Sequence, residues 1–130
     1  MATWEEIAQE NFAAVVELVS RHWRSAVNRA YYAAYARIVA ELQKAGVVFP
    51  TNREGPSHAK LPGLVETHLM RVGQMRWRVS ELSRGLYSMR LIADYRPSEE
   101  VGDGDAREAV RMMRQVFVLM KRIRNGDAIV

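Results

Sequence analysis

The spacing of the apolar residues places the strongest limit on the fold of this chain. Val79, Leu82, Leu86, Met89 and Ala93 follow one another in alternating steps of three and four. This spacing puts them on one face of a helix, as in the seam of a helical bundle. No segment shows the alternation of polar and apolar residues that is typical of a half-buried strand. The sequence therefore predicts an all-α protein.

Capping and breaking residues divide the chain into four long helices and one short one. Thr3 and Glu6 have the spacing of a capping box, Ser20 is a further N-cap residue, and Gly46 ends the helix that follows. We expect helices over residues 4–19, 20–45, 64–72 and 74–95, and a last helix that starts at Asp105. The predicted architecture is an antiparallel bundle of four long helices plus one short helix.

The length of 130 residues suits one domain, which we expect to cover residues 1–130. Its long loop, about 46–63, is rich in proline and glycine, and a loop of this length is usually functional or mobile. Cysteine is absent, which excludes disulfides, thiolate zinc sites and a cysteine nucleophile. The three histidines form no metal motif, and we expect neither a metal nor a cofactor. Without a signal peptide or an apolar stretch of membrane-spanning length, we expect a cytoplasmic protein with no membrane attachment.

The positive charge of the chain is concentrated in its second half. The net charge is +4, and six arginines between Arg71 and Arg96 face only two acids. This excess favours a polyanionic partner. A further basic stripe on the last helix is either a solvated charged face or a surface that contacts phosphates. Its members are Arg107, Arg111, Arg114 and Lys121.

Asp94 stands where local helix physics gives it little support. Pro97 disfavours helical geometry just before it, so the helix should stop near Tyr95. A carboxylate in the last turn of a helix is disfavoured by the helix dipole. Arg90 lies one turn earlier, and an arginine that precedes an acid at this spacing is the weaker orientation of the pair. We therefore expect a tertiary or functional reason for Asp94.

Polar residues form strips beside the apolar faces of two helices. One strip belongs to the second long helix and the other to the helix over 74–95; their members are Ser25, Asn28, Arg29, Tyr32, Tyr87, Arg90 and Asp94. If the strips face each other, Asp94 accepts hydrogen bonds from Arg29 and Arg90. Such a cluster is either a buried polar network that fixes the helix register or a cleft that binds phosphate or nucleotide. His58, in the long loop, is either solvated or lies over this cluster.

Two segments, residues 25–35 and the run from Arg90 to Tyr95, together resemble the HEPN domain family. Residues 25–35, with the sequence Ser-Ala-Val-Asn-Arg-Ala-Tyr-Tyr-Ala-Ala-Tyr, are similar to its second-helix signature. The run from Arg90 to Tyr95 is similar to the signature of a subgroup that ends in Ala-Asp-Tyr, and His58 sits where that subgroup often has a histidine. The resemblance covers about residues 5–124. It implies a bundle of four to five helices, frequent homodimers, and a role in prokaryotic stress, defence or toxin–antitoxin systems.

The catalytic members of this family are metal-independent ribonucleases with an Arg-x(4–6)-His motif. Here Leu91 follows Arg90, no histidine comes later, and Asp94 and Tyr95 stand where the histidine is expected. We therefore expect a non-catalytic module that binds RNA or a nucleotide. The binding residues expected are Arg29, Tyr32, Arg90, Asp94 and Tyr95.

The resemblance further implies a homodimer and a separate minimal nucleotidyltransferase, as antitoxin, for a partner. One alternative is a ribonuclease with a rearranged site, whose catalytic candidates are Arg90, Asp94, Tyr95 and His58. In it, His58 or Tyr95 replaces the usual histidine as the proton-transfer group. The other alternative is a purely structural, dimeric interaction protein.

Overall fold

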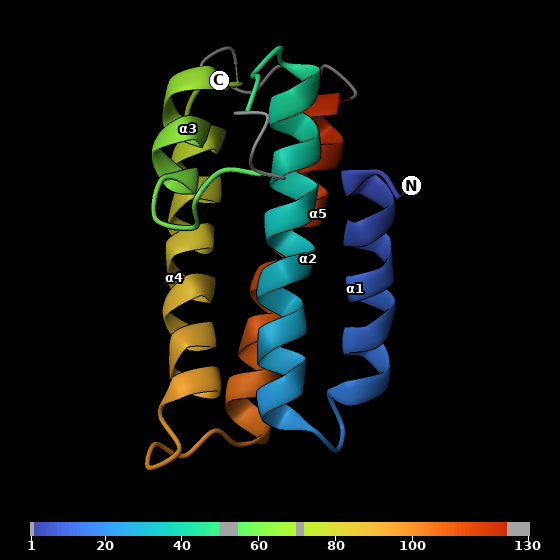
Figure 1. The fold of residues 1–130 in the computed structure, drawn as a ribbon, viewed down its shortest axis with the longest axis vertical. Helices are drawn as coiled ribbons and strands as arrows, with labels where there is room; N and C mark the ends of the chain where they lie inside the picture. The colour runs from blue at the N-terminus through green and yellow to red at the C-terminus, as the bar shows by residue number, and fades with distance from the viewer. Residues whose placement is uncertain (1, 50–54, 70–71, 125–130) are drawn as a thin grey trace.

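The four long helices alternate in direction along one long axis. The structure, a computed structural model, describes residues 2–49, 55–69 and 72–124. Its helices are α1 (Trp4–Leu18), α2 (Trp23–Lys44), α3 (Leu61–His68), α4 (Met75–Tyr95) and α5 (Asp103–Arg124). Figure 1 shows the four long helices running up and down, with the short α3 beside one end of α4. The predicted all-α bundle of four long helices and one short helix is confirmed.

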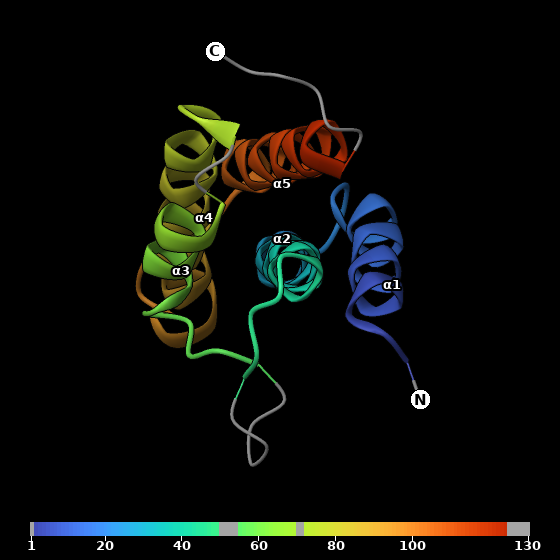
Figure 2. The same ribbon diagram turned by 90° about the horizontal axis from the view of Figure 1, so that it is seen from above.

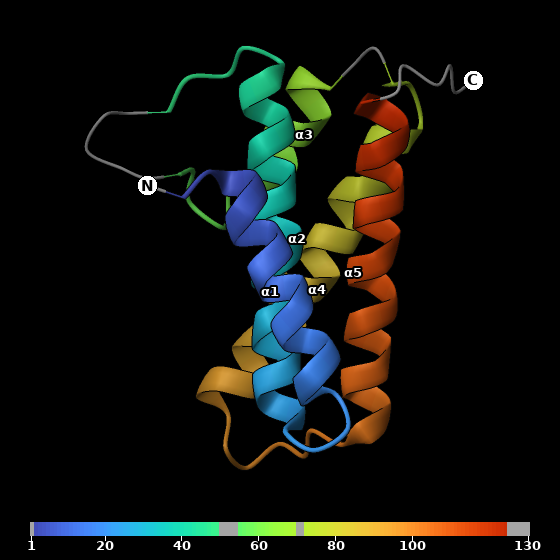
Figure 3. The same cartoon turned by 90° about the vertical axis from the view of Figure 1, so that its right-hand side faces the viewer.

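Helix α2 lies at the centre of the bundle. It packs against α1, α3, α4 and α5, and Figure 2 shows it from above with α3 and α4 on one side, α1 on the opposite side and α5 between them. Figure 3 shows α1 lying along α2 at the front of the side view. Fourteen of the 22 residues of α2 are buried, and six of these are alanines. Because alanine has a small side chain with no rotamers to restrict, neighbouring helices can approach α2 closely at little entropic cost.

Two of the predicted helix ends are confirmed in detail. The side chain of Thr3 accepts a hydrogen bond from the Glu6 amide, and the Glu6 carboxylate accepts one from the Thr3 amide, both at 3.1 Å. At the end of α2, Gly46 has a φ of 90°, a left-handed geometry that favours glycine. Its amide donates to the carbonyl of Gln43, and the next amide, of Val47, donates to the carbonyl of Leu42. These two bonds satisfy carbonyls that the helix itself leaves free.

Two helix starts differ from the prediction because the capping residues were assigned wrongly. Helix α2 begins at Trp23, and its N-cap is His22 rather than Ser20, since the amides of Arg21 and His22 still close the end of α1 on the Leu18 carbonyl. Helix α5 begins at Asp103, because the carboxylate of Asp105 accepts the Gly102 amide at 2.9 Å. Asp105 thus acts from the third helical position, as a capping-box acid does.

The short helix α3 also begins earlier than predicted. It starts at Leu61 rather than residue 64, with Pro62 in its first turn. The first turn of a helix needs no amide donor, so proline starts this helix instead of breaking it. The end of the predicted segment 64–72 includes residues 70–71, which lie outside the described residues, as do residues 50–54 of the predicted loop.

Candidate functional site

Arg90 is the centre of a polar cluster that joins α4 to α2. Its side chain is 11% exposed, and its Nε donates a hydrogen bond to Oδ2 of Asp94 at 3.1 Å. Its Nη2 lies 3.4 Å from the hydroxyl of Tyr95. The guanidinium carbon is 5.3–6.0 Å from the ring centres of Tyr31, Tyr32, Tyr87 and Tyr95. At these distances the ring faces attract the cation, which offsets part of the cost of burying it. We call these side chains, with Asn28 and His58, the Arg90 cluster.

Asp94 has the tertiary partner that its position on the helix suggested. Asn28 reaches across from α2 and donates its amide to the same carboxylate oxygen at 2.8 Å. The predicted bond from Arg29 to Asp94 is wrong, because Arg29 lies about 100° further around the helix than Asn28. It is exposed and donates instead to Oδ1 of Asn11, on α1, at 3.2 Å. The structure thus brings Tyr32, Arg90, Asp94 and Tyr95 together and places Arg29 beside them, toward α1.

The loop before α3 carries His58 into the same cluster. The Tyr31 hydroxyl and Nδ1 of His58 are 2.5 Å apart and share a hydrogen bond. The imidazole stacks on the Tyr87 ring, with ring centres 5.8 Å apart and planes 10° from parallel. Since Arg90 contacts the same two tyrosines, His58 and Arg90 flank a common pair of rings. Burial and the nearby Arg90 charge lower the pKa of His58, which favours the neutral imidazole at neutral pH.

Tyr31 of the cluster and its neighbour Tyr35 remain phenols at neutral pH. Burial, with a smaller contribution from Tyr35, raises the pKa of Tyr31 well above its ordinary value, while Arg90 opposes the shift. Burial also raises the pKa of Tyr35 to about 12. These hydroxyl groups therefore donate and accept hydrogen bonds without adding charge. They are not acids that release a proton at neutral pH.

Arg24 holds the end of α4 that carries Asp94, and this role was not predicted. From the first turn of α2 its Nη1 donates to the carbonyls of Ile92, Ala93 and Arg96 at 3.0–3.3 Å. Its Nη2 also donates to the carbonyl of Glu99. These bonds cap the end of α4, where Asp94 lies. A signal was available, because Arg24 is one turn before Asn28 on the same face of the helix.

The basic stripe on α5 lies on another side of the molecule. Figure 2 shows α5 across α2 from the loop that carries His58. Arg107 pairs with Asp103 at 2.8 Å and Arg111 with Glu108, so much of the charge is balanced within the helix. Arg114 lies over the ring of Phe12. The structure therefore does not bring the stripe and the Arg90 cluster together.

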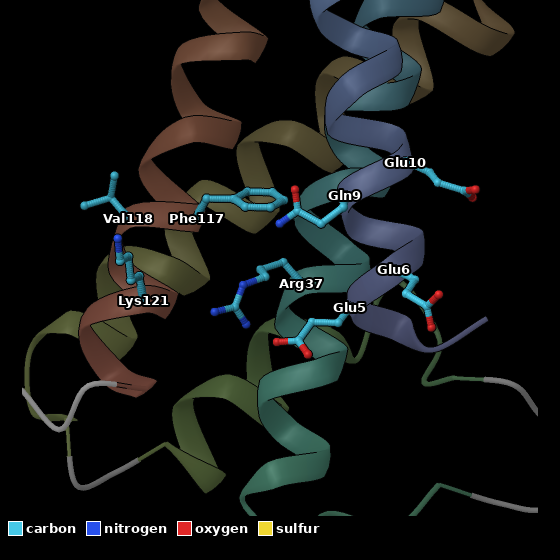
Figure 4. A pocket seen from close by; sticks show the side chains of 8 residues that line it. All are labelled: Glu5, Glu6, Gln9, Glu10, Arg37, Phe117, Val118 and Lys121. Carbon is cyan, nitrogen blue, oxygen red and sulfur yellow. The ribbon is translucent and has the colours of Figure 1, made fainter.

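A hollow with a volume of about 810 Å³ lies between α1 and α5 over α2 (Figure 4). Arg37 lies at its floor, 5% exposed, with its Nη1 3.5 Å from the carboxylate of Glu41. Burial lowers the pKa of Arg37, an effect that Glu41 opposes. The α1 side of the hollow carries acids, among them Glu10, and the α5 side carries Lys121. Because one wall of the hollow is acidic and the other basic, the hollow is a poorer site for a polyanion than the Arg90 cluster.

Comparison with known proteins agrees with the sequence resemblance. Neither a search of curated proteins nor a search of solved structures found a match. Among the helices that the structure describes, none is long and apolar enough to cross a membrane. The family model described as HEPN domain matches residues 1–123, nearly the whole chain. The chain therefore belongs to the HEPN domain family.

Proposed function

We propose that this chain is a non-catalytic HEPN module that binds the phosphate groups of RNA or of a nucleotide at the Arg90 cluster. The observation that carries the proposal is the way in which Arg90 is held. Asp94 binds its Nε, so the guanidinium is fixed while its Nη edge points toward Tyr95, which is 65% exposed. A donor that is already fixed in place loses little entropy when it binds a ligand.

The contact between Arg90 and Tyr95 leaves room for a stronger acceptor. The distance from Nη2 to the Tyr95 hydroxyl is 3.4 Å, which is long for a hydrogen bond. A phosphate oxygen binds a guanidinium at about 2.8 Å and carries charge, so it is the better partner. Two partly exposed side chains lie nearby: the Tyr32 ring centre is 5.3 Å from the guanidinium, and Asn28 binds the same Asp94 oxygen as Arg90 does.

Binding of a fluorescein-labelled single-stranded RNA, followed by fluorescence anisotropy at low salt, tests this proposal. Arg90→Lys keeps the charge and loses the planar fork, so we expect binding to weaken about tenfold. Arg84→Lys is the matched control, because it changes an exposed arginine of the same helix that pairs with Glu66. Melting curves of both variants check that the fold is kept. Equal affinity of the two variants would rule out the Arg90 cluster as the binding site and favour a purely structural role.

A second candidate function, a metal-independent ribonuclease, is favoured by the position of His58. Its imidazole flanks the same two tyrosine rings as Arg90, and its lowered pKa leaves it free to accept a proton. In that reaction the 2′-hydroxyl gives its proton to His58 and attacks phosphorus. The bond to the 5′-oxygen breaks, and water protonates the leaving oxygen. Arg90 stabilises the charge on phosphorus.

Cleavage of varied RNAs in the presence of EDTA tests the ribonuclease. The candidate requires cleavage that both His58→Gln and Arg90→Lys abolish. Cleavage that survives His58→Gln, or no cleavage of any RNA, removes it and leaves the binding module.

Family membership supports a wider setting for the binding module. We place it in a prokaryotic stress, defence or toxin–antitoxin system, as a homodimer whose partner is a minimal nucleotidyltransferase. Light scattering of the purified chain measures its mass in solution, and a mass of 14.9 kDa, that of one chain, would contradict the dimer. Co-expression with a nucleotidyltransferase from a neighbouring gene, followed by purification through a tag on one partner, tests the pair.

A further inference from the structure

A small cavity lies beside the Arg90 cluster, between the first half of α1, the middle of α2 and the loop that carries His58. Its volume is about 280 Å³, near the lower end of the range for ligand pockets. Its lining is largely aromatic, with two polar side chains on the α1 side. The members used in the argument are Trp4, Asn11, Arg29, Tyr32, Tyr35 and His58.

The aromatic walls of this cavity are held in place before any ligand arrives. The rings of Trp4 and Tyr35 meet edge to face with their centres 5.8 Å apart, and the ring centres of Tyr35 and His58 are 4.7 Å apart. The Tyr35 hydroxyl donates to the carbonyl of Pro56 at 2.6 Å. Gly55 packs behind this wall, where an added Cβ would lie 2.6 Å from the Tyr35 hydroxyl and 3.1 Å from Trp4. The close packing restricts the rings to one arrangement, which lowers the entropic cost of binding.

The polar side of the cavity offers hydrogen bonds at its edge. The Asn11 amide is fixed by two contacts, since its Nδ2 donates to the Ile7 carbonyl at 2.9 Å and its Oδ1 accepts from Arg29. Arg29 has five N–H donors, of which the bond to Asn11 uses one. An aromatic space with amide and guanidinium groups at one edge is the chemistry that recognises an unpaired nucleobase.

The geometry points to a site for one unpaired nucleobase, belonging to the same RNA strand or nucleotide whose phosphate binds Arg90. This inference rests on the proposed function and extends it. Tyr32 links the two places, because its ring lines the cavity and also lies 5.3 Å from the Arg90 guanidinium. His58 lines the cavity as well and stacks on Tyr87 of the cluster. A base stacked inside a duplex cannot enter such a space, so the module selects single strands.

Competition on the unmodified protein tests the base site without a mutation. A labelled oligoadenylate is displaced from the full chain by AMP or by ribose 5-phosphate, which carries the same phosphate and no base. We expect ribose 5-phosphate to compete about tenfold less well, because stacking of one base is lost. Equal competition by the two compounds would overturn the base site.

Two variants locate the site. Trp4→Leu removes one wall, and Trp23→Leu is its matched control, because Trp23 is also the first residue of a helix and is 39% exposed. Arg29→Leu removes the exposed edge donor, with Arg21→Leu, an exposed arginine outside the cavity, as control. We expect Trp4→Leu and Arg29→Leu to weaken binding of single strands several-fold while both controls bind as the unmodified chain does.

The outcomes separate this inference from the function on which it rests. If Arg90→Lys weakens RNA binding and Trp4→Leu and Arg29→Leu do not, the base site is wrong and the proposed function stands. If duplex RNA binds as tightly as a single strand, the base site is equally overturned. If Arg90→Lys has no effect, the phosphate site falls whatever the cavity variants do. Because Arg29→Leu changes a surface residue, it decides the question even if Trp4→Leu fails to fold.

Discussion

The carboxylate of Asp94 connects two helices, and its replacement by an amide measures the strength of that connection. Asp94→Asn keeps the size of the side chain and removes its charge. In the folded chain one oxygen accepts from Arg90 at 3.1 Å and from Asn28 at 2.8 Å. The carboxylate side chain is 23% exposed, and that of Arg90 only 11%. Solvent therefore replaces the lost interaction only in part.

The expected loss follows from the number of bonds and from the helix dipole. Each of the two hydrogen bonds changes from a charged to a neutral acceptor, which lowers the free energy of unfolding by about 1 kcal/mol per bond. Removal of a negative charge from the last turn of α4 returns about 0.5 kcal/mol. The net loss of about 1.5 kcal/mol lowers the Tm of a chain of 130 residues by about 5 °C.

Thermal melting followed by circular dichroism at neutral pH measures this change. The matched control is Glu108→Gln, which neutralises an exposed acid of an ion pair within α5. It should cost less than about 0.5 kcal/mol. Asn28→Ala, alone and combined with Asp94→Asn, isolates the link between the helices, for which we expect a coupling of about 1 kcal/mol. If Asp94→Asn has the same Tm as Glu108→Gln and the coupling free energy between positions 28 and 94 is zero, the carboxylate does not connect α2 to α4.

Three further predictions concern the surroundings of the site. Because burial and Arg90 hold the pKa of His58 below its ordinary value, the unfolded chain takes up the proton first as the pH falls below about 6.5. Stability should therefore drop more steeply with acidification in the unmodified chain than in His58→Gln, as measured by urea unfolding across pH; identical profiles would contradict a buried neutral imidazole. Arg24→Met removes the donors that cap the end of α4 and should lower the free energy of unfolding by about 2 kcal/mol. Arg24→Lys should have a stability between those of the Met variant and the unmodified chain. A Met variant as stable as the unmodified chain would show that water caps the helix equally well. Gly46→Ala should cost about 1 kcal/mol, because the φ of 90° disfavours a side chain although nothing lies near the added Cβ. Gly104→Ala, in the first turn of α5 with equally open surroundings, is the control and should not destabilise the chain.

Local features of the sequence were sufficient to predict the succession of long and short helices and a tertiary partner for Asp94. The Thr3–Glu6 capping box and the end of α2 at Gly46 depend on neighbours in the chain, so their residues alone define them. Pro62 shows the limit of this approach, because proline both breaks helices and starts them. The carboxylate of Asp94 correctly indicated a tertiary partner, since the dipole of its own helix disfavours it and Arg90 precedes it in the weaker orientation of the pair.

The partners across helices could not be predicted with the same accuracy. Arg29 and Asn28 are adjacent in the sequence, and only the rotation of α2 against α4 decides that Asn28 reaches Asp94. Arg24 was missed because its acceptors are backbone carbonyls: its place one turn before Asn28 indicates the face of the helix on which it lies but not the groups that it binds. The position of His58 depends on the path of a long loop, and periodicity says nothing about such a path.

The central position of α2 has a consequence for how the bundle opens. Every other helix in the described part of the chain contacts α2, so the departure of a single neighbour leaves its middle turns packed against the remaining ones. Amide hydrogens there should exchange only when the whole chain unfolds, whereas those of the outer helices exchange through smaller openings. A ligand that binds only the folded Arg90 cluster, part of which α2 supplies, thereby slows exchange throughout the middle of α2 and not only where it binds.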